Sequence, residues 1–339
     1  MFLIRQARPG DWRQLLKLAR ELNSTNLPTE SSELRAILER SARSFAGRIP
    51  ERSSAVYLFC AEAAGTGAIA GASMIIGKHG TPRSPHYYLQ VDSDERYSHS
   101  LRKMFRHTHL RLRYSMDGPS ELGGLIVKRT MRRSPERIGR QLSWVRFLYI
   151  AKHRARFERE LIAELLPPIA PGHRNAFWDH WGGPVTGLTF READQLSARD
   201  KQFIRELFPE SPLYTFLLPQ EVRDSIGAPG DQTRGAVRLL EQAGMRFLNQ
   251  IDPFDGGPYY GGKIADLEPV KNCRSYRITR GVGSGDGWKS FLVARDDARG
   301  FRAAKAAARA EEGRLATAPE VLKMLGVAEG DRVNAIPLP

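Results

Sequence analysis

The sequence predicts an α/β fold built on a mixed β-sheet that is flanked by helices. Three observations support this prediction: short apolar runs rich in branched residues, segments between them with apolar residues at helical spacing, and a basic loop that joins one such run to one such segment. The chain has 339 residues, of which 41% are hydrophobic. This is enough to form the cores of two or three packed units.

The N-terminal part begins with a short strand at residues 2–6, which a helix follows. Asp11 stands in a turn where its carboxylate can cap a helix over residues 12–22, and a second helix is expected at 33–45. Two apolar runs, 55–61 and 68–76, are joined by Ala-Gly-Thr-Gly. This pattern indicates an antiparallel hairpin.

The next strand leads into the feature on which the functional prediction depends. Leu122-Gly-Gly-Leu125-Ile-Val127 is typical of a buried strand, and from Gln141 onward apolar residues recur at helical spacing. The loop between them contains Arg132, Arg133, Arg137, Gly139 and Arg140. It ends at a helix N-terminus, where unpaired backbone N–H groups and the positive end of the helix dipole favour an anion. The sequence therefore predicts an anion site on this loop.

Positive charge is concentrated around the loop. Residues 101–160 contain sixteen Lys and Arg against five Asp and Glu, and the whole chain has a net charge of +14. A polyanionic ligand is therefore expected near the loop, although a solvated basic surface would give the same pattern. Nucleic acid is a less favoured ligand, because no helix-turn-helix, zinc finger or aromatic-basic RNA motif is present.

An extra segment, residues 78–119, stands between the hairpin and the central strand. From residue 110 to 115 apolar residues alternate with arginines and a serine, which indicates a half-buried strand with a basic face. His107 and His109 share that face. No carboxylate or third histidine lies beside them in the sequence, so no metal site is predicted.

The middle of the chain is expected to contain helices at residues 157–166, 200–207 and 234–243. A loop that contains His173 follows the first of them. A later turn places Asp252 and Asp255 beside two glycines. Paired carboxylates match a guanidinium group geometrically, although a tight turn alone would account for the glycines.

The last part of the chain predicts a small β-rich unit. Residues 281–287 are rich in glycine, but their spacing does not fit a nucleotide-binding loop and a strand rather than a helix follows, so a connector is expected. Helices are expected at 303–311 and 319–325, before a last strand. We therefore divide the chain into three regions with residues 1–190, 191–275 and 276–339.

The composition argues against a membrane protein and against a secreted one. No apolar run approaches the roughly 20 residues that span a bilayer. Arginines near the N-terminus interrupt what would have to be the apolar part of a signal peptide. Cys60 and Cys273 lie far apart and indicate neither a disulfide framework nor a metal site. A cytoplasmic protein is expected.

The order of motifs resembles that of a known family. The strand, the basic loop with Arg137-Ile-Gly139 and the helix are similar to the acyl-CoA pyrophosphate site of the GNAT N-acyltransferases. More narrowly, the whole chain resembles the arginine N-succinyltransferase family. The residues that carry this closer match are Ser120-Glu-Leu, Ser143-x-x-Arg-Phe, Phe177-Trp178, Glu206-Leu-x-Pro, Pro212-Leu-Tyr-Thr, Gln232-Thr233, Leu240-Glu241, Ile251-Asp-x-Phe-Asp-Gly-Gly-Pro258 and Gly330-Asp-Arg-Val333.

The resemblance implies a GNAT-like acyl-CoA-binding domain in the first region and an acceptor site in the second α/β region. It implies succinyl-CoA or another acyl-CoA as co-substrate, held by the arginine loop and by the backbone of Leu125, Ile126 and Val127. The acyl group would pass to the α-amino group of arginine or a related amino acid, with Asp252 and Asp255 binding this substrate. The implied partners are these small molecules, without a metal or a membrane, and a homo-oligomer remains open.

Two positions depart from the family pattern. The loop keeps only the second of two glycines, Gly139, while Arg137 takes the other position, where it reduces the close approach of backbone to phosphate. The proposed catalytic histidine of the family falls on Gly230, which cannot transfer a proton. Asp231 and His173 are the substitutes that this sequence offers. The alternative is a catalytically altered GNAT-like protein that binds acyl-CoA.

Overall fold

The computed structural model describes residues 1–22, 27–168, 175–197 and 200–339, which form two compact units. Unit 1 comprises Met1–Lys78, Ser120–Arg159 and Lys263–Pro339. Unit 2 comprises His79–Pro119 and Glu160–Gly262. Each unit thus combines segments that are distant in the sequence. These units do not follow the boundaries after residues 190 and 275, because the chain leaves unit 1 and returns to it twice.

Unit 1 is built on nine strands in the order β12-β15-β11-β14-β13-β1-β2-β3-β6. The pairing of β12 with β13 closes the first five of these into a small barrel, and β1 joins the barrel to the remaining strands through β13. The bounds are β1 Phe2–Gln6, β2 Val56–Ala63, β3 Ile69–Ile76, β6 Ser120–Val127, β11 Arg274–Arg280, β12 Trp288–Asp297, β13 Gly300–Glu311, β14 Arg314–Thr317 and β15 Arg332–Pro337. The predicted hairpin and the β-rich C-terminal unit are confirmed.

The helices of unit 1 are α1 Trp12–Glu21, α2 Ser31–Phe45, α3 Ile138–Lys152, α10 Glu268–Lys271 and α11 Pro319–Leu325. Eleven of the 15 residues of α3 are buried, so this helix is a central element of the core rather than an amphipathic surface helix. Its Tyr149 packs among aromatic rings from α2, β2 and β13, namely Phe45, Tyr57, Phe59 and Phe301. This packing fixes α3 and the loop that precedes it.

Unit 2 has six strands in the order β7-β10-β9-β4-β5-β8. They are β4 His86–Ser98, β5 Lys103–Ser115, β7 Glu160–Glu164, β8 Leu213–Tyr214, β9 Arg246–Ile251 and β10 Pro258–Lys263. Its helices are α4 Ala176–His180, α5 Gly182–Thr186, α6 Phe190–Ser197, α7 Gln202–Leu207, α8 Gln220–Ser225 and α9 Arg234–Gln242. No described helix in either unit combines the length and the apolar character needed to cross a bilayer.

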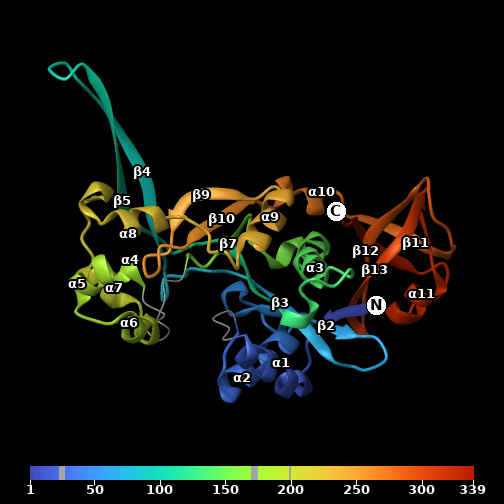
Figure 1. The fold of residues 1–339 in the computed structure, drawn as a ribbon. Helices are drawn as coiled ribbons and strands as arrows, with labels where there is room; N and C mark the ends of the chain where they lie inside the picture. The colour runs from blue at the N-terminus through green and yellow to red at the C-terminus, as the bar shows by residue number, and fades with distance from the viewer. Residues whose placement is uncertain (23–26, 169–174, 198–199) are drawn as a thin grey trace. The chain divides into compact units, whose positions relative to one another are not determined.

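Strands β4 and β5 form a hairpin that extends beyond the rest of the unit 2 sheet (Figure 1). They pair continuously from His86 opposite Ser115 to Ser98 opposite Lys103. The base of the hairpin packs in the core through residues such as Leu110, whereas Tyr97 near the tip is half exposed. The strand predicted at residues 110–115 is confirmed as part of β5.

Two helix predictions were wrong. Residues 157–166 contain strand β7, and residues 303–311 belong to strand β13. Both segments are rich in alanine, leucine or glutamate, which favour helices in isolation. The pairing of β13 with β1, β12 and β14 overrides that preference, because each pairing supplies a ladder of backbone hydrogen bonds. For β7, Pro167 and Pro168 stop the chain too soon for a stable helix.

Candidate functional site

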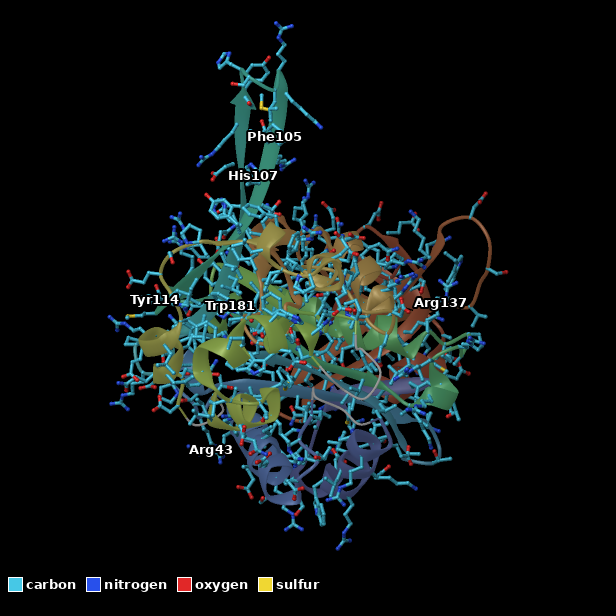
Figure 2. The ribbon with its side chains drawn as sticks, turned by 60° about the vertical axis from the view of Figure 1, so that its left-hand side comes forward. Arg43, Phe105, His107, Tyr114, Arg137 and Trp181 are labelled. Carbon is cyan, nitrogen blue, oxygen red and sulfur yellow. The ribbon has the colours of Figure 1, made fainter. Side chains whose placement is uncertain are left out.

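The predicted strand, basic loop and helix are present in unit 1 as β6, residues 128–137 and α3. The side chains of Arg132, Arg133 and Arg137 are exposed, and Arg140 is partly buried. Figure 2 shows Arg137 at the surface of unit 1. The Nε of Arg132 donates a hydrogen bond to the carbonyl of Val127 at 3.2 Å, which ties the loop back to the end of the strand. The loop thus presents several guanidinium groups to solvent.

The start of α3 offers backbone donors to the same place. The Arg137 carbonyl accepts hydrogen bonds from the N–H groups of Arg140 at 2.9 Å and Gln141 at 3.3 Å. For the N–H groups of Ile138 and Gly139, no acceptor is recorded among the residues that the structure describes. A helix of 15 residues adds its dipole to these donors. Burial, together with the neighbouring Arg137, lowers the pKa of Arg140, as expected where positive charges crowd.

Arg137 adopts a left-handed backbone conformation, with φ 49° and ψ 52°. This conformation is typical of glycine and costs other residues roughly 1–2 kcal/mol. Arg137 therefore keeps the backbone geometry of a glycine while it adds a guanidinium group. The space around Gly139 is open, because a Cβ atom there would contact only Val127 Cγ2 at 3.6 Å.

Strand β6 is irregular at Leu125, the first of the predicted pantetheine-binding residues. Its pairing with β3 shifts register between Ala72 and Met74, so that Gly124 and Leu125 lie opposite Ser73, and Gly124 has φ +60°. Such a bulge re-aims the backbone of the strand. Leu125 is partly exposed, whereas Ile126 and Val127 after the bulge are buried and pair regularly with β3.

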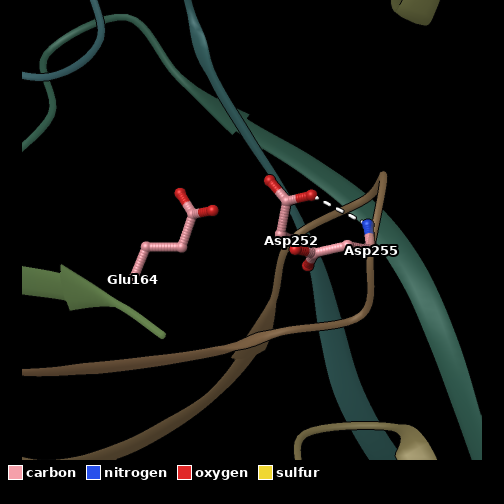
Figure 3. Close-up of side chains that lie close together, drawn as sticks. All are labelled: Glu164, Asp252 and Asp255. Atoms are coloured by element: carbon pink, nitrogen blue, oxygen red, sulfur yellow. Dashed lines mark hydrogen bonds between the residues drawn. The ribbon is translucent and has the colours of Figure 1, made fainter. Parts of the chain in front are cut away.

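In unit 2 the structure brings Asp252 and Asp255 together and adds a third carboxylate, Glu164 at the end of β7 (Figure 3). Carboxylate oxygens of the three residues all lie within 4.8 Å of one another. The hydroxyl of Tyr259 lies 3.2 Å from both Glu164 Oε2 and Asp252 Oδ2. Because the hydroxyl has one proton, it can donate to only one of these carboxylates at a time. Three acidic side chains thus meet in one place, where a proton or a cation would reduce their mutual repulsion.

The turn that holds the two aspartates is fixed by their own oxygens. Asp252 Oδ1 accepts hydrogen bonds from the N–H groups of Phe254 at 2.7 Å and Asp255 at 3.1 Å, and Asp255 Oδ1 accepts one from Gly257 at 2.7 Å. A Cβ atom on Gly257 would stand 2.4 Å from the Leu165 carbonyl oxygen, so only glycine fits. The glycines therefore serve the turn, and the turn holds the carboxylates in place.

Burial raises the pKa of both Asp252 and Asp255, and for Asp255 the adjacent Asp252 carboxylate raises it further. A raised carboxylate pKa means that the ionised group costs stability in the folded state. The cost is absent below the ordinary aspartate pKa of about 3.9, grows as the pH rises towards the raised value, and is constant above it. At neutral pH the ionised forms of Asp252 and Asp255 thus lower the stability of the fold, and the positive charge of Lys201 offsets part of this cost at Asp252.

We expect Asp255→Asn to stabilise the substrate-free protein at pH 7. The amide oxygen can still accept the Gly257 N–H, while the charge repulsion with Asp252 disappears, so unfolding free energy should rise by about 1 kcal/mol. Thermal unfolding followed from pH 7 down to pH 3.5 checks this. The advantage of the variant should shrink as the pH falls, and a variant that is less stable at pH 7 would contradict the assignment of strain.

Of the two predicted proton acceptors, Asp231 and His173, the structure describes Asp231. Asp231 has a side chain that is 88% exposed and forms an ion pair with Arg234 at 2.9 Å. His173 lies outside the described residues. Gly230 packs tightly: its N–H bonds to the Leu166 carbonyl at 2.9 Å, and a Cβ atom would stand 2.5 Å from the Pro167 carbonyl oxygen. The backbone in this region therefore leaves no room for a side chain at position 230.

Glu164 was missed because its segment was predicted to be a helix. The apolar run Leu161-Ile-Ala163 before two prolines was the available signal for a short strand that ends at a carboxylate. Among the described residues, the group with oxygen atoms placed to hold a metal ion is Glu164, Asp252 and Asp255. Three carboxylates suit a hard divalent cation as well as an organic one.

Comparisons with known proteins show the family to which this chain belongs. The family model for the arginine N-succinyltransferase beta subunit matches residues 2–269, and the model for its C-terminal domain matches residues 274–337. Arginine N-succinyltransferases of Escherichia coli (strain 55989 / EAEC) and Shigella flexneri are each 31% identical to this chain over 341 residues, which is 100% of the chain and 98% of each relative.

A solved structure gives the same result for the fold. The structure of arginine/ornithine succinyltransferase subunit AI from Pseudomonas aeruginosa matches with a TM-score of 0.85 and 25% sequence identity, covering 100% of this chain and 99% of that one. The agreement thus extends over the whole length of both proteins. From its sequence and its fold together, this chain belongs to the arginine N-succinyltransferase family.

Proposed function

We propose that this protein transfers a succinyl group from succinyl-CoA to the α-amino group of arginine. The amine nitrogen attacks the thioester carbonyl, a C–N bond forms, the C–S bond breaks, and the departing CoA thiolate takes up the proton that the amine releases. The observation that carries the proposal is the full-length match to arginine N-succinyltransferases. The proposal includes a cytoplasmic location and a role in arginine breakdown.

The loop of unit 1 supports the acyl-CoA part of the proposal. Arg132, Arg133, Arg137 and Arg140 offer guanidinium groups that can pair bidentately with phosphate, and the first turn of α3 offers backbone N–H groups. The diphosphate of CoA would bind there. The pantetheine arm would then follow the backbone of Val127, Ile126 and Leu125 towards the bulge in β6.

The carboxylate cluster of unit 2 supports the choice of acceptor. A guanidinium group carries one positive charge spread over five N–H donors, and it would relieve the repulsion between Asp252 and Asp255 while it pairs with their oxygens. Glu164 completes this set of acceptors. A neutral side chain of the same shape would bring no positive charge to these carboxylates, so we expect the cluster to favour arginine over citrulline.

The reaction also needs a proton acceptor. The α-amino group is mostly protonated at neutral pH and must lose a proton before it attacks. We keep Asp231 and His173 as the candidates. Since Asp231 is exposed and paired with Arg234, its replacement by asparagine should have little effect if a water molecule or His173 serves instead.

The experiment mixes the purified protein with succinyl-CoA and L-arginine and follows both the free CoA thiol and N-succinylarginine. Citrulline, ornithine and α-N-acetylarginine serve as comparison acceptors, because they alter the guanidinium group or block the amine. The proposal expects turnover with arginine, weaker turnover with citrulline and none with the blocked amine. Equal turnover of arginine and citrulline would contradict the assigned acceptor site.

A second candidate function is binding of acyl-CoA without transfer, which the glycine at position 230 favours. If the protein lacked only the family's histidine and its site were otherwise complete, Gly230→His would raise the turnover number. We expect the opposite, a loss of stability of about 2 kcal/mol or more and no gain in turnover, because the Cβ atom would collide with the Pro167 carbonyl. Thermal unfolding and initial rates check this, with Gly235→His as the control, since a Cβ atom at Gly235 meets nothing within 4 Å.

A further inference from the structure

Arg146 in α3 is a buried arginine with an unusual set of partners. Three arginines among the described residues are buried: Arg5, Arg146 and Arg295, with exposed fractions of 5%, 3% and 4%. Arg5 pairs with Asp11 and Glu62, and Arg295 pairs with Asp297. Arg146 has no carboxylate partner among the described residues, so its charge is the one that lacks compensation.

Among the described residues, Arg146 donates its hydrogen bonds to neutral groups, and the donor–acceptor distances are long. Its Nε donates to the Ser143 carbonyl at 3.3 Å, its Nη2 donates to Ser143 Oγ at 3.1 Å, and its Nη1 donates to the Gly123 carbonyl at 3.4 Å. A guanidinium group has five N–H donors, so this set leaves donor capacity unused. Burial lowers the pKa of Arg146 to about 9, which still leaves it charged at neutral pH.

A buried cation without a counter-charge is expensive to maintain unless an anion joins it. The protein itself supplies none at this place within the described residues. The same buried position could be filled by an apolar side chain at no electrostatic cost. The arrangement therefore points to an anion that arrives with a ligand.

The contact that Arg146 makes with β6 restricts which part of the ligand this anion can be. Arg146 contacts Gly123, which directly precedes the bulge and stands two residues before Leu125, on the side away from the basic loop that follows Val127. If the diphosphate binds the loop and the thioester lies near Leu125, an acyl chain that continues in the same direction approaches Gly123. Two strand residues span roughly 6–7 Å. This matches a chain of three C–C bonds, about 4 Å, plus one hydrogen bond of about 2.8 Å.

We propose that Arg146 binds the distal carboxylate of the acyl group and thereby makes the site selective for a dicarboxylic acyl-CoA such as succinyl-CoA. This inference rests on the proposed function, because it places the thioester beside β6. It adds the residue that distinguishes a succinyl group from an uncharged acyl group. Ser143 would help by holding Nη2 in place through its hydroxyl.

A purely structural role would have a different signature. Arg146 could hold the bulge of β6 through the Gly123 carbonyl without touching the acyl group. In that case its replacement would impair every acyl-CoA to the same extent. Butyryl-CoA separates the two roles, since it has the same length as succinyl-CoA but carries a methyl group in place of the carboxylate.

The experiment compares succinyl-CoA, butyryl-CoA and CoA in the wild type, Arg146→Met and Arg146→Lys, by Kd and by kcat/KM with arginine. Methionine fills a similar volume without charge, and lysine restores the charge. Arg156→Met is the matched control, because Arg156 also bonds only to neutral groups, the Tyr149 hydroxyl and the carbonyls of Ser44 and Phe45. Thermal unfolding verifies that each variant is folded.

We expect the wild type to prefer succinyl-CoA over butyryl-CoA by about 30-fold or more, the effect of removing one partner of a buried charge pair. Arg146→Met should abolish this preference, Arg146→Lys should retain part of it, and Arg156→Met should retain all of it. CoA itself should bind every variant equally. Equal losses for both thioesters, or equal affinity of the wild type for both, would overturn the inference. Failure of the wild type to bind CoA would instead overturn the proposed function.

Discussion

Replacement of Arg133 by alanine together with Arg137 by glycine is expected to weaken CoA binding about 100-fold. A hydrogen bond to a charged group contributes roughly 1.5–3 kcal/mol, and a tenfold change in Kd corresponds to about 1.4 kcal/mol. Glycine is the better replacement at position 137, because the left-handed backbone there would strain alanine. Isothermal titration with CoA at fixed ionic strength measures the change.

The control for this variant is Arg43→Ala. Arg43 is an exposed arginine on α2 of the same unit, and it lies away from Arg137 (Figure 2). Its removal lowers the net charge without touching the loop. An equal loss of CoA affinity in the control would mean that the overall basic surface, rather than this loop, attracts the ligand. Unchanged affinity in the double variant would remove the loop from the binding site altogether.

Removal of one charge from the carboxylate cluster should have the second large effect. We expect Asp252→Asn and Glu164→Gln each to lower kcat/KM for arginine on the order of 100-fold, because each leaves a buried cation with fewer counter-charges. The turn should survive in Asp252→Asn, since the amide oxygen can accept the same two backbone N–H groups. Steady-state kinetics at saturating succinyl-CoA measures the loss.

The selectivity for arginine over citrulline is the control for this second prediction. In both variants the ratio of arginine to citrulline turnover should fall, whereas CoA affinity should stay unchanged. Glu221→Gln, at an exposed position on α8, should alter neither quantity. A metal in the cluster would produce a different outcome, because a chelator would then reduce the activity of the wild type as strongly as the substitutions do.

The candidate anion site of unit 1 could be predicted from local sequence. Strand β6, the arginine loop and α3 are contiguous, and their signals are apolar periodicity and charge, which act over a few residues. The conformation of Arg137 could not be predicted from the residue type, since arginine seldom adopts positive φ. The depth at which Arg146 is buried was equally hidden, because a charged residue in a helix suggests a solvent-facing side.

The carboxylate cluster of unit 2 was only partly predictable. Asp252 and Asp255 are close in the sequence and share one turn, so their proximity follows from the turn itself. Glu164 comes from β7, nearly ninety residues earlier, and no local pattern links it to that turn. The same reason explains the incorrect helix at residues 303–311, where strand pairing with distant segments outweighs the helical preference of alanine.

The central claim is that this chain moves a succinyl group onto the amine of arginine. Its most direct test is the mass of the product formed when wild-type protein, succinyl-CoA and L-arginine are mixed, measured together with the free thiol. We expect N-succinylarginine and CoA to form in equal amounts. The claim would be contradicted if the protein bound CoA tightly but released no CoA thiol from succinyl-CoA in the presence of arginine, ornithine or any other amino acid.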